Sequence, residues 1–113
     1  MDMGTTPQIL HEYVTRTGKN PFRKWLLSLR DIHARAKIRV RLNRIRSGNF
    51  GDVKSIGDGV SELKINHGPG YRVYFAKKGN AIVLLLCGGD KPSQTKDIKT
   101  AKEHWADYNK RLS

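Results

Sequence analysis

The sequence predicts an α+β domain in which helices pack on a small antiparallel sheet. Three observations lead to this class. Two segments near the N-terminus carry helix signals, three apolar runs separated by turn residues follow them, and an amphipathic segment ends the chain. The expected order is therefore β-α-α-β-β-β-α. We expect one domain over residues 1–113, because a chain of this length builds a single modest core.

The first strand and the first helix are expected before residue 30. Residues 8–14 mix apolar and polar side chains and are predicted to form a short strand. Asn20 is a capping residue, and Pro21 suits the first position of a helix. The apolar residues that follow lie at helical spacing and form one stripe: Phe22, Trp25, Leu26 and Leu29.

Residues 31–47 are ambiguous, because HARAKIRVRL alternates apolar and basic side chains as a strand does. The segment is long for a strand, its Ala, Arg, Lys and Leu favour a helix, and the alternation fails at Asn43. Asp31 can cap the start of a helix and Gly48 its end. We therefore predict a helix, which would bury Ala34, Ile38, Leu42 and Ile45.

The second half of the chain is predicted to form three strands and a helix. Residues 49–59, with three glycines, are expected to be a loop. Strands are expected at 60–66, 71–77 and 81–88, separated by short turns. The third strand is apolar on both faces, as expected of a central strand. Ser93 can cap a last helix, whose stripe is Ile98, Ala101, Trp105 and Tyr108.

The hairpin over residues 62–75 carries a polar set of side chains on one face. A tight turn sets its apolar residues opposite one another, Leu63 against Val73 and Ile65 against Tyr71. The other face then pairs Lys64 with Arg72 and Glu62 with Tyr74. Neighbouring cations repel by about 0.2–1 kcal/mol, so stability alone does not explain this pattern. The alternative is an ordinary solvated face.

The chain is strongly basic, with 22 Lys and Arg against 10 Asp and Glu and a net charge of +12. Eleven of the basic residues lie in residues 16–46, where Asp31 is the only acid. Such an excess indicates a polyanionic partner, which is nucleic acid, a ribonucleoprotein or an acidic protein, with plain solubility as the alternative. The predicted RNA-binding and ribosome-binding residues are Arg35, Arg39, Arg41, Arg44, Arg46 and Lys54.

Metal-free RNA cleavage is a chemistry that these residues allow. The acids are scattered, no His-x-x-x-His or phosphate-binding loop occurs, and Cys87 stands alone, so we expect no metal and no cofactor. In metal-free cleavage the substrate's 2′-hydroxyl attacks the adjacent phosphate, and the protein moves protons and stabilises charge. The catalytic candidates are Arg72, Lys64 and Lys91 for the phosphate, Glu62 and then His67 as base, and Tyr74 as proton donor or base-stacking group.

Three stretches carry a resemblance to a known family: GVSELKI, GPGYRVYF and LLLCGGDKPSQTKDIKTA. At these residues the chain resembles the RelE/ParE superfamily of bacterial toxins, in its HigB-like branch of addiction module killer or phage Gp49-like proteins. The likeness runs from residues 22–26 to Trp105. It implies a RelE-like domain with the fold predicted above, and a toxin neutralised by a cognate antitoxin, often a helix-turn-helix protein.

The resemblance leaves the target open. Members similar to RelE cut mRNA in the ribosomal A site, whereas those similar to ParE poison DNA gyrase. Arg72 matches the arginine that contacts the scissile phosphate, and Lys64 and Lys91 match basic positions. Glu62 stands where a lysine assists in RelE-type members, and the C-terminal region has Trp105 and Tyr108 at helical spacing instead of a catalytic cluster.

We therefore predict a type II toxin that acts as a ribosome-dependent mRNA endoribonuclease. The alternatives are a gyrase inhibitor that acts by binding and a noncatalytic nucleic-acid-binding domain. The expected partners are the antitoxin, the ribosome and mRNA. No apolar run approaches the roughly 18 residues that span a bilayer, and no basic-then-apolar leader begins the sequence, so we expect a cytoplasmic protein without membrane contact.

Overall fold

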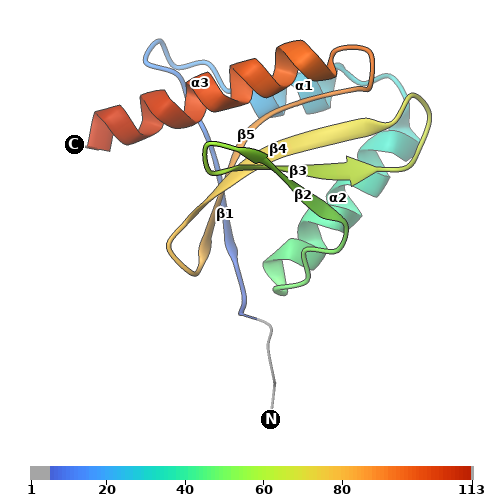
Figure 1. The fold of residues 1–113 in the computed structure, drawn as a ribbon. Helices are drawn as coiled ribbons and strands as arrows, with labels where there is room; N and C mark the ends of the chain where they lie inside the picture. The colour runs from blue at the N-terminus through green and yellow to red at the C-terminus, as the bar shows by residue number, and fades with distance from the viewer. Residues whose placement is uncertain (1–5, 113) are drawn as a thin grey trace.

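The computed structural model describes residues 6–112 and confirms the α+β class (Figure 1). Its elements are, in chain order, β1 (Ile9–Glu12), α1 (Pro21–Ser28), α2 (Ile32–Arg46), β2 (Val53–Gly57), β3 (Val60–Ile65), β4 (Tyr71–Lys78), β5 (Ile82–Gly89) and α3 (Gln94–Leu112). No helix in this part of the chain is both long and apolar enough to cross a membrane.

The five strands form one mixed sheet in the order β1-β5-β4-β3-β2. Consecutive strands from β2 to β5 pair antiparallel, as predicted, but β1 runs parallel to β5, with Leu10 beside Val83. The expectation of a purely antiparallel sheet is therefore wrong at this edge. The connection explains the difference, because α1 and α2 carry the chain away from β1 and a strand reached through helices can return in the parallel direction.

Residues 49–59 are not entirely a loop, because β2 occupies residues 53–57 within them. The strand ends at a two-residue turn, where Asp58 and Gly59 have φ values of 56° and 81°. Both values lie in the left-handed region that an Asp-Gly hairpin turn requires. β2 forms the outer edge of the sheet, and most of its residues are exposed, which is why its weak apolar pattern did not predict it.

Helices cover both faces of the sheet, and each face has its own apolar cluster. Helices α1 and α2 pack on one face, against side chains such as Leu63, Val73 and Phe75. Helix α3 crosses the other face, where Tyr74 and Leu86 pack under Ala101 (Figure 1). With both faces covered, the exposed residues of the two central hairpin strands β3 and β4 lie near the strand ends.

The helix signals predicted at Asn20 and Asp31 are confirmed. The Ser93 hydroxyl, predicted to cap the last helix, instead donates hydrogen bonds to the Asp90 and Asp97 carboxylates. The Asn20 side chain accepts a hydrogen bond from the backbone N–H of Arg23, and Asp31 accepts from His33 and Ala34. Helix α2 buries the four residues predicted for its inner face, Ala34, Ile38, Leu42 and Ile45. The caps satisfy backbone N–H groups that have no partner within the helix, which fixes where each helix begins.

Two consecutive glycines end β5 because a helix approaches it closely from each face. A Cβ added at Gly88 would overlap the Trp25 ring of α1. On the other face, a Cβ at Gly89 would overlap the Asp97 carboxylate of α3. Only glycine lets both helices pack this closely at the end of the strand.

Candidate functional site

The register predicted for the central hairpin is confirmed. β3 and β4 pair Leu63 with Val73, Ile65 with Tyr71, Lys64 with Arg72, and Glu62 with Tyr74. Lys64 and Arg72 thus project from neighbouring strands on the same face of the sheet. This is the face that α3 covers, but the two cations lie near the sheet end where α3 only begins.

The two cations line an open hollow of about 370 Å³ at this end of the sheet. One wall is the β3–β4 turn, whose Gly68 and Gly70 have positive φ values. Lys91, in the connection between β5 and α3, also lines the hollow. The complete lining is Lys64, Asn66, His67, Gly68, Pro69, Gly70, Arg72 and Lys91. The structure therefore brings four of the six predicted catalytic residues around one space, three of them cations and one an imidazole.

Arg72 is held rigidly beside the hollow. Its Nη1 donates a hydrogen bond of 2.7 Å to the Gly70 carbonyl, and its Nε lies 3.6 Å from Glu62 Oε1. Only 5% of its surface is exposed. Glu62, also 5% exposed, accepts a hydrogen bond of 2.9 Å from Gln94 of α3. Helix α3, Glu62 and the turn together fix the position of this guanidinium.

Glu62 and Tyr74, two of the predicted catalytic residues, are buried in the structure. Tyr74 has no exposed surface, and its ring lies in the apolar cluster under α3. Burial, followed by the nearby Glu62 carboxylate, raises the pKa of the Tyr74 hydroxyl above its ordinary value. Neither residue lines the hollow. The hairpin sequence has the pattern of a sheet with one exposed face. The face that carries Glu62 and Tyr74 is covered only because α3 packs on it.

Asp31 is a site residue that the sequence did not predict beyond its capping role. One carboxylate oxygen caps α2, while Oδ2 lies 2.9 Å from Nε2 of His67 in the β3–β4 turn. The His67 ring also stacks on Tyr71, with centroids 6.5 Å apart. Hydrogen bonds from His67 and from backbone N–H groups hold the pKa of Asp31 below its usual value. The imidazole is thus oriented by a carboxylate 36 residues away, a pairing that sequence spacing does not indicate.

The basic residues of α2 separate into two groups on different sides of the helix. Lys37, Arg41 and Arg44 line a shallow depression with Asn66, which also lines the hollow. Arg41 donates hydrogen bonds to the backbone carbonyls of Lys64 and Asp52, so it also ties α2 to β3. The first group therefore continues the cationic surface away from the hollow.

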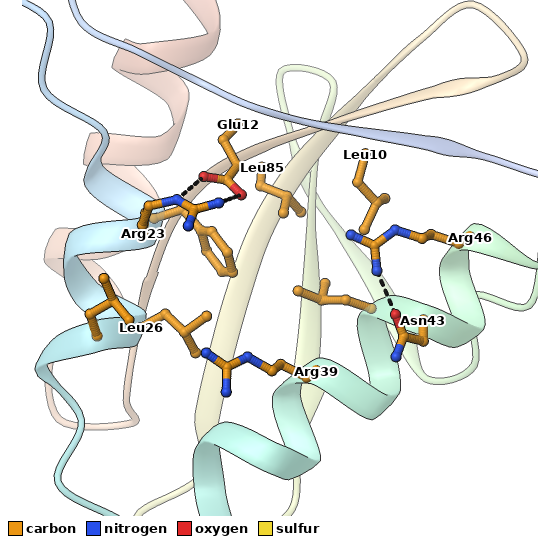
Figure 2. A pocket seen from close by; sticks show the side chains of 11 residues that line it. Leu10, Glu12, Arg23, Leu26, Arg39, Asn43, Arg46 and Leu85 are labelled. Atoms are coloured by element: carbon orange, nitrogen blue, oxygen red, sulfur yellow. Dashed lines mark hydrogen bonds and ion pairs between the residues drawn. The ribbon is translucent and has the colours of Figure 1, made fainter. Parts of the chain in front are cut away.

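The second group faces α1. Arg39 and Arg46 line a cleft between α1 and α2 together with Arg23 (Figure 2). Arg35 is half-buried on α2, and Lys54 is exposed on the edge strand β2, opposite Glu62. The predicted RNA-binding set of six is therefore not one continuous surface in the structure.

The arrangement can bind an anion and move a proton. Three cations around one hollow suit a phosphate group. The planar guanidinium of an arginine can donate two parallel hydrogen bonds to phosphate oxygens, and each lysine ammonium adds a positive point charge. An imidazole held by a carboxylate can accept a proton. Within residues 6–112, no group of three or more His, Cys, Asp or Glu side chains is placed to hold a metal ion.

The fold is a small α+β domain with helices on both faces of a mixed sheet and a cationic hollow at one end of it. The family model of phage-derived Gp49-like proteins matches residues 24–113, and the chain belongs to this family. At a coarse level the family is part of the RelE/HigB-like group of toxins, which indicates a toxin of a toxin–antitoxin system with an antitoxin partner.

A protein of Haemophilus influenzae (strain ATCC 51907 / DSM 11121 / KW20 / Rd) described as uncharacterized is a similar relative. It is 53% identical over 81 residues, which cover 72% of this chain and 82% of the relative. The likeness supports the family assignment.

Proposed function

We propose that the protein is a toxin that cleaves mRNA on the ribosome without a metal ion. The observation that carries the proposal is the hollow that Lys64, Arg72 and Lys91 share with His67. Positive charge concentrated on one phosphate position stabilises the negative charge that develops during cleavage. The toxin assignment of the family supports the same conclusion.

The phosphate would lie between a fixed cation and two mobile ones. Arg72 is anchored by Gly70 and Glu62, so its guanidinium needs little reorganisation when a substrate binds. Lys64 and Lys91 are exposed, and their ammonium groups can follow the phosphate oxygens. This combination suits binding of a scissile phosphate whose charge increases toward the transition state.

His67 is the proposed general base, in place of Glu62, which the sequence alone favours. Glu62 is buried and bonded to Gln94, which suits a residue that positions Arg72. His67 lines the hollow and would take the proton from the 2′-hydroxyl. The 2′-oxygen then bonds to phosphorus, the bond to the 5′-oxygen breaks, and that oxygen is protonated by a lysine ammonium or water. The products are a 2′,3′-cyclic phosphate and a 5′-hydroxyl end.

The RNA would continue from the hollow over the first group of α2 cations. Lys37, Arg41 and Arg44 adjoin the hollow through Asn66, which places further positive charge along the path of a backbone. Among the described residues, no second histidine that could act as a paired acid lines the hollow. We therefore propose that the ribosome supplies substrate positioning and that activity on free RNA is weak.

A reconstituted translation reaction with mapping of new RNA 5′ ends tests the proposal. Lys64→Ala should lower ribosome-dependent cleavage about 10²-fold, the usual cost of removing one charge-stabilising group. Lys99→Ala, an exposed change on α3 away from the hollow, should leave cleavage unchanged. Intact mRNA, together with trapped gyrase cleavage complexes, would instead favour the gyrase-directed alternative.

A further inference from the structure

We infer that the cleft between α1 and α2 is the docking site for an acidic segment of the antitoxin, which inserts an apolar side chain between the helices. The cleft has a volume of about 230 Å³ and lies on the opposite face of the sheet from α3. The inference rests on the toxin assignment in one respect, because that assignment identifies the partner as an antitoxin. The catalytic hollow takes no part in it.

The floor of the cleft is aliphatic. Leu10 of β1, Leu26 of α1, Leu42 of α2 and Leu85 of β5 meet there, as Figure 2 shows for the labelled side chains. Leu27 lies at the edge and has 56% of its surface exposed. An opening between two helices with apolar walls receives a side chain from a partner more readily than it holds water.

The rim of the cleft carries more positive charge than its one carboxylate neutralises. Glu12 accepts hydrogen bonds of 2.8 and 2.9 Å from Arg23, which pairs these two charges. Arg46 donates to the neutral amide oxygen of Asn43. Arg39 reaches toward α1 without a hydrogen bond or ion pair among residues 6–112 (Figure 2). The guanidinium groups of Arg39 and Arg46 can therefore bind carboxylates of a partner.

These features favour a protein segment over RNA. Single-stranded RNA is usually held by aromatic side chains on which bases stack, whereas the cleft floor is aliphatic and its Phe22 is buried. An amphipathic acidic segment matches both the aliphatic floor and the cationic rim of the cleft. Its apolar side chain would lie on the floor, and its carboxylates would pair with Arg39 and Arg46. A second copy of this chain is a poor occupant, because each copy carries a net charge of +12.

Binding measurements test the inference, with the protein encoded by the reading frame next to the toxin gene as the probe. The toxin is purified with Lys64→Ala so that it can be produced alone, and affinity is measured by titration calorimetry. Arg39→Glu and Arg46→Glu should each weaken binding at least tenfold, and Leu27→Asp should do so as well. Arg44→Glu makes the same charge change on the other side of α2. The affinity of this variant for the antitoxin should stay within twofold of that of the parent chain.

Each other outcome overturns the inference. Equal losses of affinity from Arg44→Glu and Arg39→Glu would mean that the attraction is general and not located in the cleft. Unchanged affinity in the cleft variants, or no binding by the parent chain, would exclude the cleft as the docking site. Loss of ribosome binding with intact antitoxin binding would make it an RNA surface. Because the measurement is binding, a chain that never cleaves mRNA still gives a decisive result.

Discussion

Arg72 and Glu62 form a buried ion pair that connects the hollow to the interior. Both residues are 5% exposed, and the pair is completed by Gly70 on one side and Gln94 on the other. A charge removed from water is tolerated only with such partners. The same contacts that hold the guanidinium beside the hollow therefore also support the fold.

Arg72→Ala should accordingly destabilise the protein, although a solvent-facing arginine would have tolerated the change. Removing one member of a buried ion pair leaves the other charge unpaired, and we expect the free energy of unfolding to fall by about 3 kcal/mol. Lys64→Ala, at the paired exposed position, should change it by less than about 0.5 kcal/mol. Urea unfolding followed by circular dichroism measures both values. Equal stabilities would show that the pair does not form.

The contact between Asp31 and His67 predicts a coupled effect on cleavage. His67→Ala should lower ribosome-dependent cleavage about 10²-fold or more if the imidazole takes the proton. Asp31→Asn should lower it about tenfold, because the ring loses the carboxylate that orients it. In the His67→Ala background, Asp31→Asn should have no further effect. Additive reductions from the two changes would assign Asp31 a separate structural role.

At the scale of single elements, α3 contributes a pH dependence to stability. His104 stacks on Tyr13, which follows β1, with ring centroids 4.6 Å apart. Burial lowers the pKa of His104 below its ordinary 6.5, while the carboxylates of Glu103 and Asp107 oppose this effect. The unfolded chain therefore binds a proton at a higher pH than the folded chain does.

The sign of this linkage predicts loss of stability on acidification. Stability contributed by neutral His104 is complete above about pH 6.5 and is lost as the pH falls from there through the folded-state pKa. His104→Gln should flatten the dependence of the unfolding free energy on pH between about 7.5 and 5.5 relative to the wild type. Glu12 and Asp107, with lowered pKa values, act only at more acidic pH. An unchanged slope in the variant would assign it to another group.

The elements also show what local sequence patterns can and cannot predict. Helix α2 was predicted despite its alternating pattern, because length and residue preference outweigh a short period-2 run. Strand β2 was missed, although Asp58-Gly59 is a strong hairpin signal between it and β3. The register of the central hairpin followed from pleating alone. The burial of Tyr74 could not be predicted from pleating, because it depends on which part of the sheet a distant helix covers.

At the scale of the whole molecule, the positive charge is distributed over distinct surfaces. The hollow and the first α2 group, Lys37, Arg41 and Arg44, adjoin one another through Asn66. The cleft with Arg39 and Arg46 lies on the side of α2 that faces α1. One helix thus presents cations to two different spaces, which would let one chain bind both an RNA and an acidic protein.

This distribution predicts that the two sides of α2 differ in how they affect ribosome binding. Each cation removed from the RNA-binding surface should reduce the slope of log affinity against log salt by about 0.7–0.9. The double change Lys37→Gln and Arg44→Gln should therefore weaken ribosome binding and reduce the slope by about 1.4–1.8. Arg39→Gln with Arg46→Gln removes the same charge from the other side, and its slope should match that of the wild type. Sedimentation with ribosomes at several salt concentrations measures both. Equal slopes in the two double variants would mean that the ribosome responds to the total charge of the chain and that α2 has no dedicated RNA side.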